Sequence, residues 1–293
     1  MDNSAICGVG TATVTPFKAD GAVDYDALEK FLQFQVDGGV NFLVPLGTTG
    51  ETPTLTEAEQ IEIIKIAMRV AAGKIPLVVG CTSNNTEEAI QRGKRFKEVG
   101  VTHILSACPY YNKPTQEGIY RHFKAIREQT HLEIMLYNVP GRTASNALPE
   151  TIARLAEEGV VFAVKEASGS ILQMQELCQR TNGGLNVLSG DDAMTLPLMA
   201  VGGVGVVSVA ANIVPRAMRE WTDTITERNY VKAREQLKPL LPLFDACFKE
   251  SNPIPVKGGA KLLGLMDTHY RLPMVPPSAE TMQNMEKVLT PFR

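Results

Sequence analysis

A lysine at the end of an apolar segment is the residue with the clearest chemical potential. Lys165 follows Val-Phe-Ala-Val at 161–164 and precedes Glu166. A lysine that ends a buried strand must pair with an anion, extend its ammonium to solvent or lose its proton. Desolvation favours the neutral amine, which attacks a carbonyl carbon to form a Schiff base. The position therefore predicts a nucleophile, with a structural ion pair to Glu166 or another carboxylate as the alternative.

A tyrosine and an arginine follow another apolar segment. Tyr137 ends Met-Leu-Tyr at 135–137, and Arg142 lies in the loop beyond it. If the two strands are neighbours, the Tyr137 phenol faces the same cavity as Lys165 and can move protons while a carbinolamine forms and loses water. Arg142 can bind a carboxylate with its guanidinium fork. Taken singly, a tyrosine that caps the core and an arginine in a surface ion pair are the commoner fates.

A small, hydroxylated turn is a candidate anion site. Gly-Thr-Thr-Gly-Glu at 47–51 follows an apolar segment. Its successive backbone N–H groups and the hydroxyls of Thr48 and Thr49 can converge on an anion. An ordinary glycine turn is the alternative.

Three more segments would complete a ring of loops. Tyr110 and Tyr111 lie in a proline-bounded loop, which is typical of a subunit contact or of a hydroxyl presented to a site. Ser-Gly-Asp-Asp at 189–192 follows another apolar segment, and Val-Val-Ser at 206–208 lies on the last one. Without the other motifs, close packing at the glycine and a core position for the valines are the default interpretation.

Strands that alternate with helices must position these residues. Apolar segments that predict buried strands recur at 10–14, 41–46, 77–80, 103–107, 133–137, 161–165, 186–188 and 205–209. Helical patterns lie between them at 25–36, 86–99, 116–129, 147–158, 171–181 and 193–200, and a capping box at 56–59 opens another helix. Eight such units predict an α/β fold, the (β/α)8 TIM barrel, whose active site lies at the carboxyl ends of the strands. A doubly wound sheet is disfavoured because no GxGxxG turn follows the first strand.

The strand pattern ends before the C-terminal part of the chain. Residues 225–293 show helical pattern only, with breaks predicted at Pro239, Pro253 and Pro273. We therefore expect a barrel domain over residues 1–224 and a small C-terminal helical appendage over residues 225–293.

Composition excludes several classes of protein. The 293 residues include 29 Lys plus Arg and 32 Asp plus Glu, so no basic surface for nucleic acid or anionic lipid is expected. Five widely spaced cysteines and four histidines without ligand spacing predict reduced thiols and no metal site. The uncharged segment 193–215 is interrupted by proline and glycines, which favours a buried helix, turn and strand over a membrane span. With no signal-peptide pattern at the N-terminus, we expect a cytoplasmic protein.

Together the motifs resemble the dihydrodipicolinate synthase family, within the pyruvate-dependent class I aldolase superfamily of (β/α)8 barrels. Motifs similar to those of the superfamily are Thr-Pro-Phe at 15–17, Gly-Thr-Thr-Gly-Glu at 47–51 and Lys-Glu-Ala-Ser at 165–168. Closer to the synthases are Pro-Tyr-Tyr-Asn-Lys-Pro at 109–114, Tyr-Asn-Val-Pro-Gly-Arg-Thr at 137–143 and Ser-Gly-Asp-Asp at 189–192. The resemblance covers essentially the whole chain, and Arg142 separates it from the sialic-acid lyase branch.

The resemblance implies the condensation of pyruvate with L-aspartate 4-semialdehyde to 4-hydroxytetrahydrodipicolinate, for diaminopimelate and lysine biosynthesis, without cofactor or metal. It implies a Schiff base on Lys165, with protons relayed by Tyr137, Thr48 and Tyr111. Tyr111 would come from a neighbouring subunit of a homotetramer, a dimer of dimers. Pyruvate would contact Thr49, Gly190 and Val207, and Arg142 would bind the carboxylate of the semialdehyde.

A feedback site for lysine matches the family only in part. Asn84, Glu88 and Tyr110 resemble the inhibitor contacts, whereas Glu57 and Gln60 stand where lysine-sensitive bacterial relatives often carry histidines. We therefore expect inhibition by lysine to be weak or absent.

Two other functions stay open. One is a different pyruvate-dependent aldolase that acts on a sugar acid, which Arg142 and the tyrosine pair disfavour. The other is a non-catalytic barrel that binds a small carboxylate or a partner protein. A substitution of Lys165 discriminates, because a binding module would keep its ligand affinity.

Overall fold

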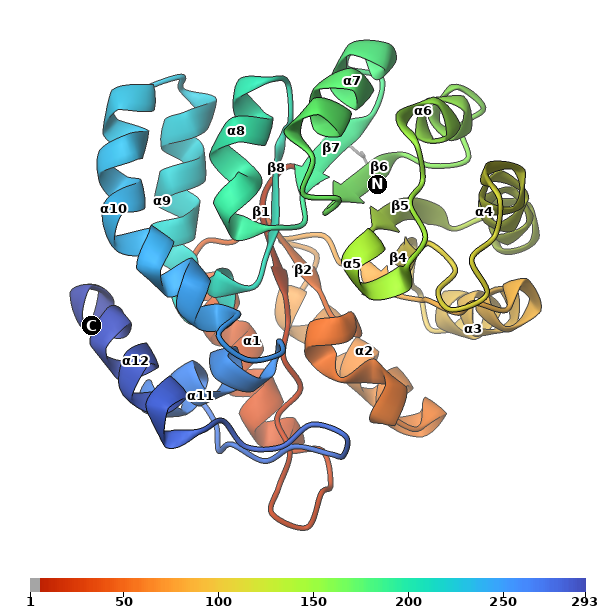
Figure 1. Ribbon diagram of the computed structural model, residues 1–293. Coiled ribbons are helices and arrows are strands. Elements are labelled where there is room, and N and C mark those ends of the chain that lie inside the picture. The colour runs from red at the N-terminus through yellow and green to blue at the C-terminus, as the bar shows by residue number, and fades with distance from the viewer. Residues whose placement is uncertain (1–5) are drawn as a thin grey trace. The chain divides into compact units, whose positions relative to one another are not determined.

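The computed structural model describes residues 6–293, and Figure 1 draws its helices and strands. The chain forms two compact units. Unit 1 contains residues 6–7 and 77–207, and unit 2 contains residues 8–76 and 208–293. Along residues 6–293 eight strands alternate with helices, which is the predicted order.

Unit 1 is a parallel sheet with the helices that connect its strands. The strands are β3 (Val79–Gly80), β4 (His103–Ala107), β5 (Glu133–Asn138), β6 (Ala163–Glu166), β7 (Asn186–Ser189) and β8 (Gly205–Ser208). The last residue of β8, Ser208, belongs to unit 2. Each strand pairs in parallel with the next. The helices are α3 (Thr86–Glu98), α4 (Gln116–Thr130), α5 (Pro140–Thr143), α6 (Pro149–Glu157), α7 (Ile171–Thr181) and α8 (Thr195–Ala200). Nearly every strand residue is buried, which explains why apolar residues dominate the strands.

Unit 2 holds the first two strands and the C-terminal helices. Strands β1 (Gly8–Ala12) and β2 (Phe42–Val44) pair in parallel. The helices are α1 (Tyr25–Asp37), α2 (Glu57–Ala71), α9 (Pro215–Thr226), α10 (Tyr230–Cys247), α11 (Ile254–Leu262) and α12 (Ala279–Leu289). The predicted capping box opens α2, because Thr56 N donates to Glu59 Oε2 at 2.8 Å and Glu59 N donates to Thr56 Oγ1 at 3.3 Å. The fold class is therefore the predicted (β/α)8 TIM barrel with helices at its C-terminus.

Helix α10 corrects one prediction. It continues through Pro239 and Pro242, whereas the sequence predicts a break at Pro239. Each proline removes one helical N–H donor. The apolar face of α10 nevertheless packs on α9, where the rings of Trp221 and Phe244 lie 5.7 Å apart, and this packing keeps the helix intact. The breaks predicted at the other two prolines are confirmed at Pro253 and Pro273.

The uncharged segment 193–215 contains α8, a glycine turn and β8, as predicted. None of the helices found between residues 6 and 293 has the length and apolar character that a membrane crossing requires. The domain boundary expected after residue 224 lies two residues before the end of α9 and stays a prediction.

Candidate active site

Lys165 and Tyr137 lie side by side on neighbouring strands of unit 1. Tyr137 of β5 is the register partner of Lys165 of β6, so both side chains project from the same face of the sheet. Lys165 Nζ lies 4.2 Å from the centroid of the Tyr137 ring. The amine and the phenol are therefore close enough to act on one bound substrate.

Burial sets the protonation of both groups. Lys165 is 5% exposed, and this desolvation lowers the pKa of its amine to about 8. Asp192, a buried residue without a predicted role, opposes the lowering of the Lys165 pKa, and the Arg142 guanidinium adds to it. Among residues 6–293 no carboxylate pairs with the Lys165 ammonium. Burial raises the pKa of Tyr137 to about 12, so its phenol keeps its proton at neutral pH.

Glu166 is not the partner of Lys165, which removes that alternative. Its carboxylate accepts hydrogen bonds from Asn138 Nδ2 at 2.9 Å and from Ser168 N at 2.6 Å. Successive side chains of a strand point to opposite faces, so the register that pairs Lys165 with Tyr137 pairs Glu166 with Asn138 on the other face.

Two of the predicted substrate-binding residues lie on the Lys165 side of the sheet. Gly190 follows β7, and a Cβ at this position would lie 2.7 Å from Ala167 Cβ and 3.1 Å from Lys165 Cγ. Only glycine leaves room for the lysine side chain to pass. Val207 of β8 is buried, and its register places it on the face that carries Lys165.

Arg142 lies in α5, directly after β5, and is exposed. Its positive charge lowers the pKa of both Lys165 and Tyr137. Within residues 6–293 Arg142 forms no ion pair. A guanidinium in this state is suited to bind a substrate carboxylate.

Tyr110 and Tyr111 lie in the loop after β4, and hydrogen bonds hold this loop. Asn84 Nδ2 donates to Tyr110 O at 3.1 Å, and Ser145 Oγ donates to Pro109 O at 2.7 Å. Tyr111 has a φ of 71°, and its side chain is 89% exposed. A large aromatic side chain held in this rare conformation and surrounded by solvent is typical of a contact site.

The residues predicted to bind lysine are partly engaged within the chain. In unit 1 Glu88, in the first turn of α3, accepts a hydrogen bond from Ser83 Oγ at 2.6 Å. In unit 2 Glu57 begins α2, and the buried Gln60 donates its amide to Leu55 O at 3.1 Å. The Gln60 amide thus donates to the backbone carbonyl of Leu55.

The predicted anion-binding turn, residues 47–51, follows β2 in unit 2. It contains a 3₁₀ turn whose first hydrogen bond is donated by Gly50 N. The N–H groups of Thr48 and Thr49 therefore do not take part in the hydrogen bonds of this turn. Thr48 is exposed and Thr49 is buried. Thr15 Oγ1 donates to Gly50 O at 2.8 Å and ties the turn to the segment after β1.

A buried ion pair that the sequence reasoning missed anchors the end of this turn. Lys257 of α11 is 0% exposed, and its Nζ donates to Glu51 Oε1 at 2.6 Å and to His269 O at 2.7 Å. The available signal was a lysine between the apolar residues Ile-Pro-Val at 254–256 and Gly-Gly-Ala at 258–260, where a charge requires a buried partner.

Two further residues from the C-terminal part of unit 2 contact the same region and were also missed. Asn252 Nδ2 donates to Thr49 Oγ1 at 2.9 Å. Arg271 donates to Thr54 O at 2.7 Å and forms a bidentate ion pair with Glu59 in the first turn of α2. No local sequence pattern connects these residues to the turn, because their separation along the chain is large.

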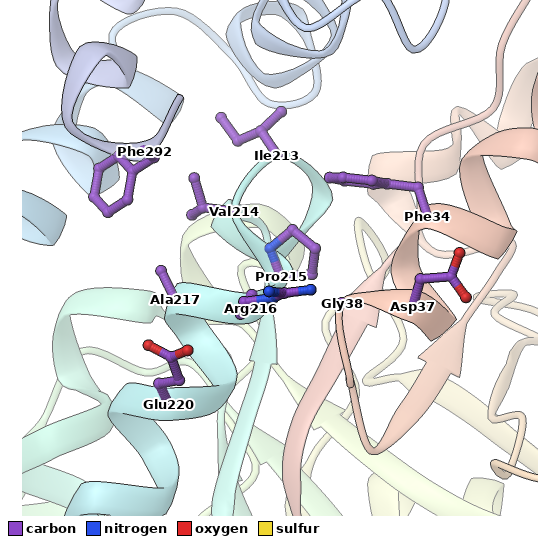
Figure 2. Close-up of a pocket in the computed structure, with 10 residues that line it drawn as sticks. All are labelled: Phe34, Asp37, Gly38, Ile213, Val214, Pro215, Arg216, Ala217, Glu220 and Phe292. Atoms are coloured by element: carbon purple, nitrogen blue, oxygen red, sulfur yellow. The ribbon is translucent and has the colours of Figure 1, made fainter.

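A groove in unit 2 lies apart from all predicted site residues. Its volume is about 470 Å³, and it is bordered by the end of α1, the start of α9 and Phe292 (Figure 2). Figure 2 shows the charged groups of Asp37, Arg216 and Glu220 along it. Nowhere between residues 6 and 293 do His, Cys, Asp or Glu side chains form a group of three able to hold a metal ion.

Comparison with known proteins identifies the family. The profile of the Dihydrodipicolinate synthetase family matches residues 5–291. The 4-hydroxy-tetrahydrodipicolinate synthase of Koribacter versatilis is 49% identical over 282 residues, which are 96% of this chain and 94% of that protein. The dihydrodipicolinate synthase structure from Thermotoga maritima has a TM-score of 0.95 at 42% identity, with 97% of this chain and 98% of that chain covered. The 4-hydroxy-tetrahydrodipicolinate synthase from Methylacidiphilum fumariolicum has a TM-score of 0.94 at 39% identity, with 97% and 95% covered. The chain therefore belongs to the dihydrodipicolinate synthetase family.

Proposed function

We propose that this protein is a lyase that condenses pyruvate with L-aspartate 4-semialdehyde to 4-hydroxytetrahydrodipicolinate, a step toward diaminopimelate and lysine. Family membership supports this activity, and relatives with 43% and 49% identity bear the corresponding enzyme name. In the structure, the observation that carries the proposal is Lys165, a buried amine with a pKa of about 8 beside a phenol. The neutral amine that Schiff-base formation requires is thus populated near neutral pH.

The reaction proceeds on the Lys165 nitrogen. The amine attacks the keto carbon of pyruvate, and the carbinolamine loses water to give an iminium. Because the iminium withdraws electrons, the pyruvate methyl loses a proton, and the enamine carbon attacks the aldehyde carbon of the second substrate. The aldehyde oxygen takes a proton and becomes the hydroxyl of the product. The amino group of the former semialdehyde then attacks the iminium carbon, closes the ring and releases Lys165.

Tyr137 carries protons in these steps. Its pKa of about 12 keeps the phenol protonated, which is the form that donates a proton when the carbinolamine hydroxyl leaves as water. Thr48 and Tyr111 return the proton to Tyr137 in this proposal.

The remaining predicted residues bind the substrates. The Thr49 hydroxyl and the adjacent N–H groups of the 47–51 turn hold the carboxylate of pyruvate. Gly190 and Val207 line the pyruvate pocket. Arg142 binds the carboxylate of the semialdehyde, which its lack of an ion pair within residues 6–293 supports.

Tyr111 acts in the site of a neighbouring subunit within a homotetramer, a dimer of dimers. Its 89% exposure and the hydrogen-bonded loop that presents it support this role. Mixing Tyr111→Phe subunits with Lys165→Ala subunits should restore activity in hybrid dimers, because one of the two sites then has both intact residues. Hybrid dimers without restored activity would contradict it.

Regulation and location complete the proposal. Lysine binds Asn84, Glu88 and Tyr110 weakly or not at all, and the internal hydrogen bond of Gln60 supports this expectation. The enzyme acts in the cytoplasm, where a reducing environment suits its five free cysteines.

Borohydride reduction of the protein with pyruvate, followed by peptide mass spectrometry, tests the mechanism. We expect a pyruvyl adduct on Lys165 and none in the Lys165→Ala variant. The peptide that contains Lys257 is an internal control, because this lysine is buried but ion-paired and should stay unmodified. A folded protein without an adduct contradicts the mechanism. An adduct without turnover of the semialdehyde points to an aldolase for a sugar acid.

A further inference from the structure

Asn252 contacts Thr49 of the proposed pyruvate site, although the two residues are 203 positions apart in the chain. We infer that Asn252 is a positioning residue whose amide orients the Thr49 hydroxyl as a hydrogen-bond donor toward the carboxylate of pyruvate. The inference rests on the proposed function and adds a determinant of pyruvate affinity to the 47–51 turn.

The hydrogen bond between the two side chains sets the polarity of the hydroxyl. Asn252 Nδ2 donates to Thr49 Oγ1 at 2.9 Å, and both side chains are buried. A hydroxyl accepts through its lone pairs and donates its single proton. Because the amide occupies the acceptor side, the Thr49 proton points elsewhere, and no residue between 6 and 293 accepts it. The hydroxyl thus offers the donor that a carboxylate needs.

The turn does not need Asn252 to keep its shape. Three other side chains hold its backbone and its last residue, through Thr52 Oγ1 to Gly47 O at 2.9 Å, Thr15 Oγ1 to Gly50 O at 2.8 Å and Lys257 Nζ to Glu51 Oε1 at 2.6 Å. The Asn252 amide reaches the Thr49 hydroxyl and not the backbone of the turn. Its effect therefore falls on the group that meets the substrate.

The other atom of the amide argues against a purely structural role. Asn252 Oδ1 is buried, and no donor within the described part of the chain reaches it. Buried polar atoms nearly always have hydrogen-bond partners, and an unmatched acceptor lowers the stability of the fold. Asn252 therefore lowers stability through its unmatched Oδ1, so stability alone does not explain its presence beside Thr49. What Asn252 supplies is an amide N–H that donates to the Thr49 hydroxyl.

Asn252→Asp tests the inference, because aspartate has the same shape but its carboxylate can only accept. It would accept a hydrogen bond from the Thr49 hydroxyl and so turn the O–H away from the substrate. We expect the pyruvate concentration that gives half-maximal borohydride trapping on Lys165 to rise about 10- to 100-fold, the range for a lost hydrogen bond to a charged group. The amount of adduct at saturating pyruvate should stay near that of the wild-type protein. The melting temperature should fall, because the new carboxylate is buried and one of its oxygens has no donor among the described residues.

A second variant at position 252 and a double-mutant cycle with Thr49→Val distinguish orientation of the Thr49 hydroxyl from repulsion between the new carboxylate and pyruvate. Asn252→Leu removes both the donor and the unmatched acceptor, so the half-saturating concentration should rise by less, while the melting temperature stays equal or increases. In a Thr49→Val background, Asn252→Asp should cause no further rise, because the hydroxyl through which it acts is absent. Asn229→Asp is the matched control, because Asn229 caps α10 only as an acceptor for Lys232 N, and its titration should be that of the wild-type protein.

Two results would overturn the inference while the proposed function stands. One is a folded Asn252→Asp protein that titrates with pyruvate like the wild-type protein. The other is an equal rise in the Thr49→Val background, which would show direct repulsion of the substrate. If Asn252→Asp does not fold, the inference is overturned when Asn252→Leu shows the same half-saturating pyruvate concentration as the wild-type protein. A wild-type protein that forms no adduct contradicts the proposed function itself and the inference with it.

Discussion

Lys165 in unit 1 and Lys257 in unit 2 are both buried, but their surroundings differ. Lys257 Nζ donates to Glu51 Oε1 at 2.6 Å and to His269 O at 2.7 Å. Lys165 Nζ faces the Tyr137 ring at 4.2 Å and has no ion-pair partner among residues 6–293. Burial lowers the pKa of both amines, and at Lys257 the Glu51 carboxylate opposes this effect.

The comparison teaches that burial by itself does not make a lysine a nucleophile. An ammonium with a carboxylate and a carbonyl around it keeps its charge and fixes the structure. At Lys165 no carboxylate forms an ion pair with the ammonium, and desolvation outweighs the opposing charge of Asp192, so the neutral amine becomes accessible. The Lys165 amine at the end of β6 is therefore reactive, whereas Lys257 of α11 stabilises the 47–51 turn.

Replacing each lysine by methionine should have the largest effects, in opposite directions on stability. Lys165→Met removes the nucleophile, so activity should fall at least about a thousandfold. Because a destabilised charge disappears, the free energy of unfolding at pH 7 should rise by up to about 3 kcal/mol. Lys257→Met leaves the buried Glu51 carboxylate without its ion-pair partner, so the free energy of unfolding should fall by about 3–5 kcal/mol. Urea denaturation together with an activity assay measures both changes.

Glu51→Gln is the control for the ion pair. The double variant Lys257→Met with Glu51→Gln should be more stable than the sum of the two single effects predicts, because neither charge is then left unpaired. A loss of stability in Lys165→Met as large as that in Lys257→Met would break the comparison.

Alanine substitutions at Gly190 and Gly47 should change the free energy of unfolding by different amounts, and this difference is smaller than that between the two lysine variants. Alanine at Gly190 brings a Cβ within 2.7 Å of Ala167 Cβ and 3.1 Å of Lys165 Cγ, so the free energy of unfolding should fall by about 1–3 kcal/mol. Alanine at Gly47 meets no atom of the described residues within 4 Å, so the change there should stay within about 0.5 kcal/mol. Thermal denaturation of the two variants checks this. Equal effects would show that Lys165 does not pack tightly on Gly190.

The pH dependence of Schiff-base formation should show the smallest effect. With a pKa of about 8, the Lys165 amine is mostly protonated at pH 7 and mostly neutral at pH 9, so the trapping rate at low pyruvate should rise about tenfold between them. Tyr137, with a pKa of about 12, does not titrate in this range. Arg142→Leu removes a charge that lowers the Lys165 pKa, so the rise should move to higher pH. A rise centred near 10.5, the ordinary lysine pKa, would contradict the assignment.

The same titration has a consequence for stability. Between pH 8 and pH 10.5 the folded protein has lost the Lys165 proton, whereas the unfolded chain still binds it. The unfolded state then binds more protons, so the contribution of Lys165 to the free energy of unfolding increases as the pH rises. Lys165→Met should lack this increase.

Local patterns predicted most of unit 1. The predicted and observed bounds agree for β4 at 103–107 and for α7 at 171–181. Apolar runs and turn residues mark such elements because each element's own sequence favours it. Prolines were less reliable, since the break predicted at Pro239 ignores the packing of α10 on α9. Tertiary contacts of this kind override local preference.

The candidate site divides in the same way. Lys165, Tyr137 and Arg142 could be selected from the sequence, because parallel strands of a barrel end at one face and the residues at their ends are few. The contributions of Asn252, Lys257 and Arg271 could not. They act on residues more than 200 positions earlier in the chain, such as Thr49 and Glu51, and no periodicity links such distant segments.

The sequence by itself determined the alternation of strands and helices and the position of Lys165 at a strand end, because strand periodicity and burial are properties of short segments. Only the tertiary structure decided that Lys165 lacks an ion-pair partner within residues 6–293 while Lys257 has Glu51, and that Asn252 orients its amide on Thr49. The physical reason is that desolvation and side-chain hydrogen bonds depend on which distant segments pack together, and that packing sets which buried amine keeps its proton.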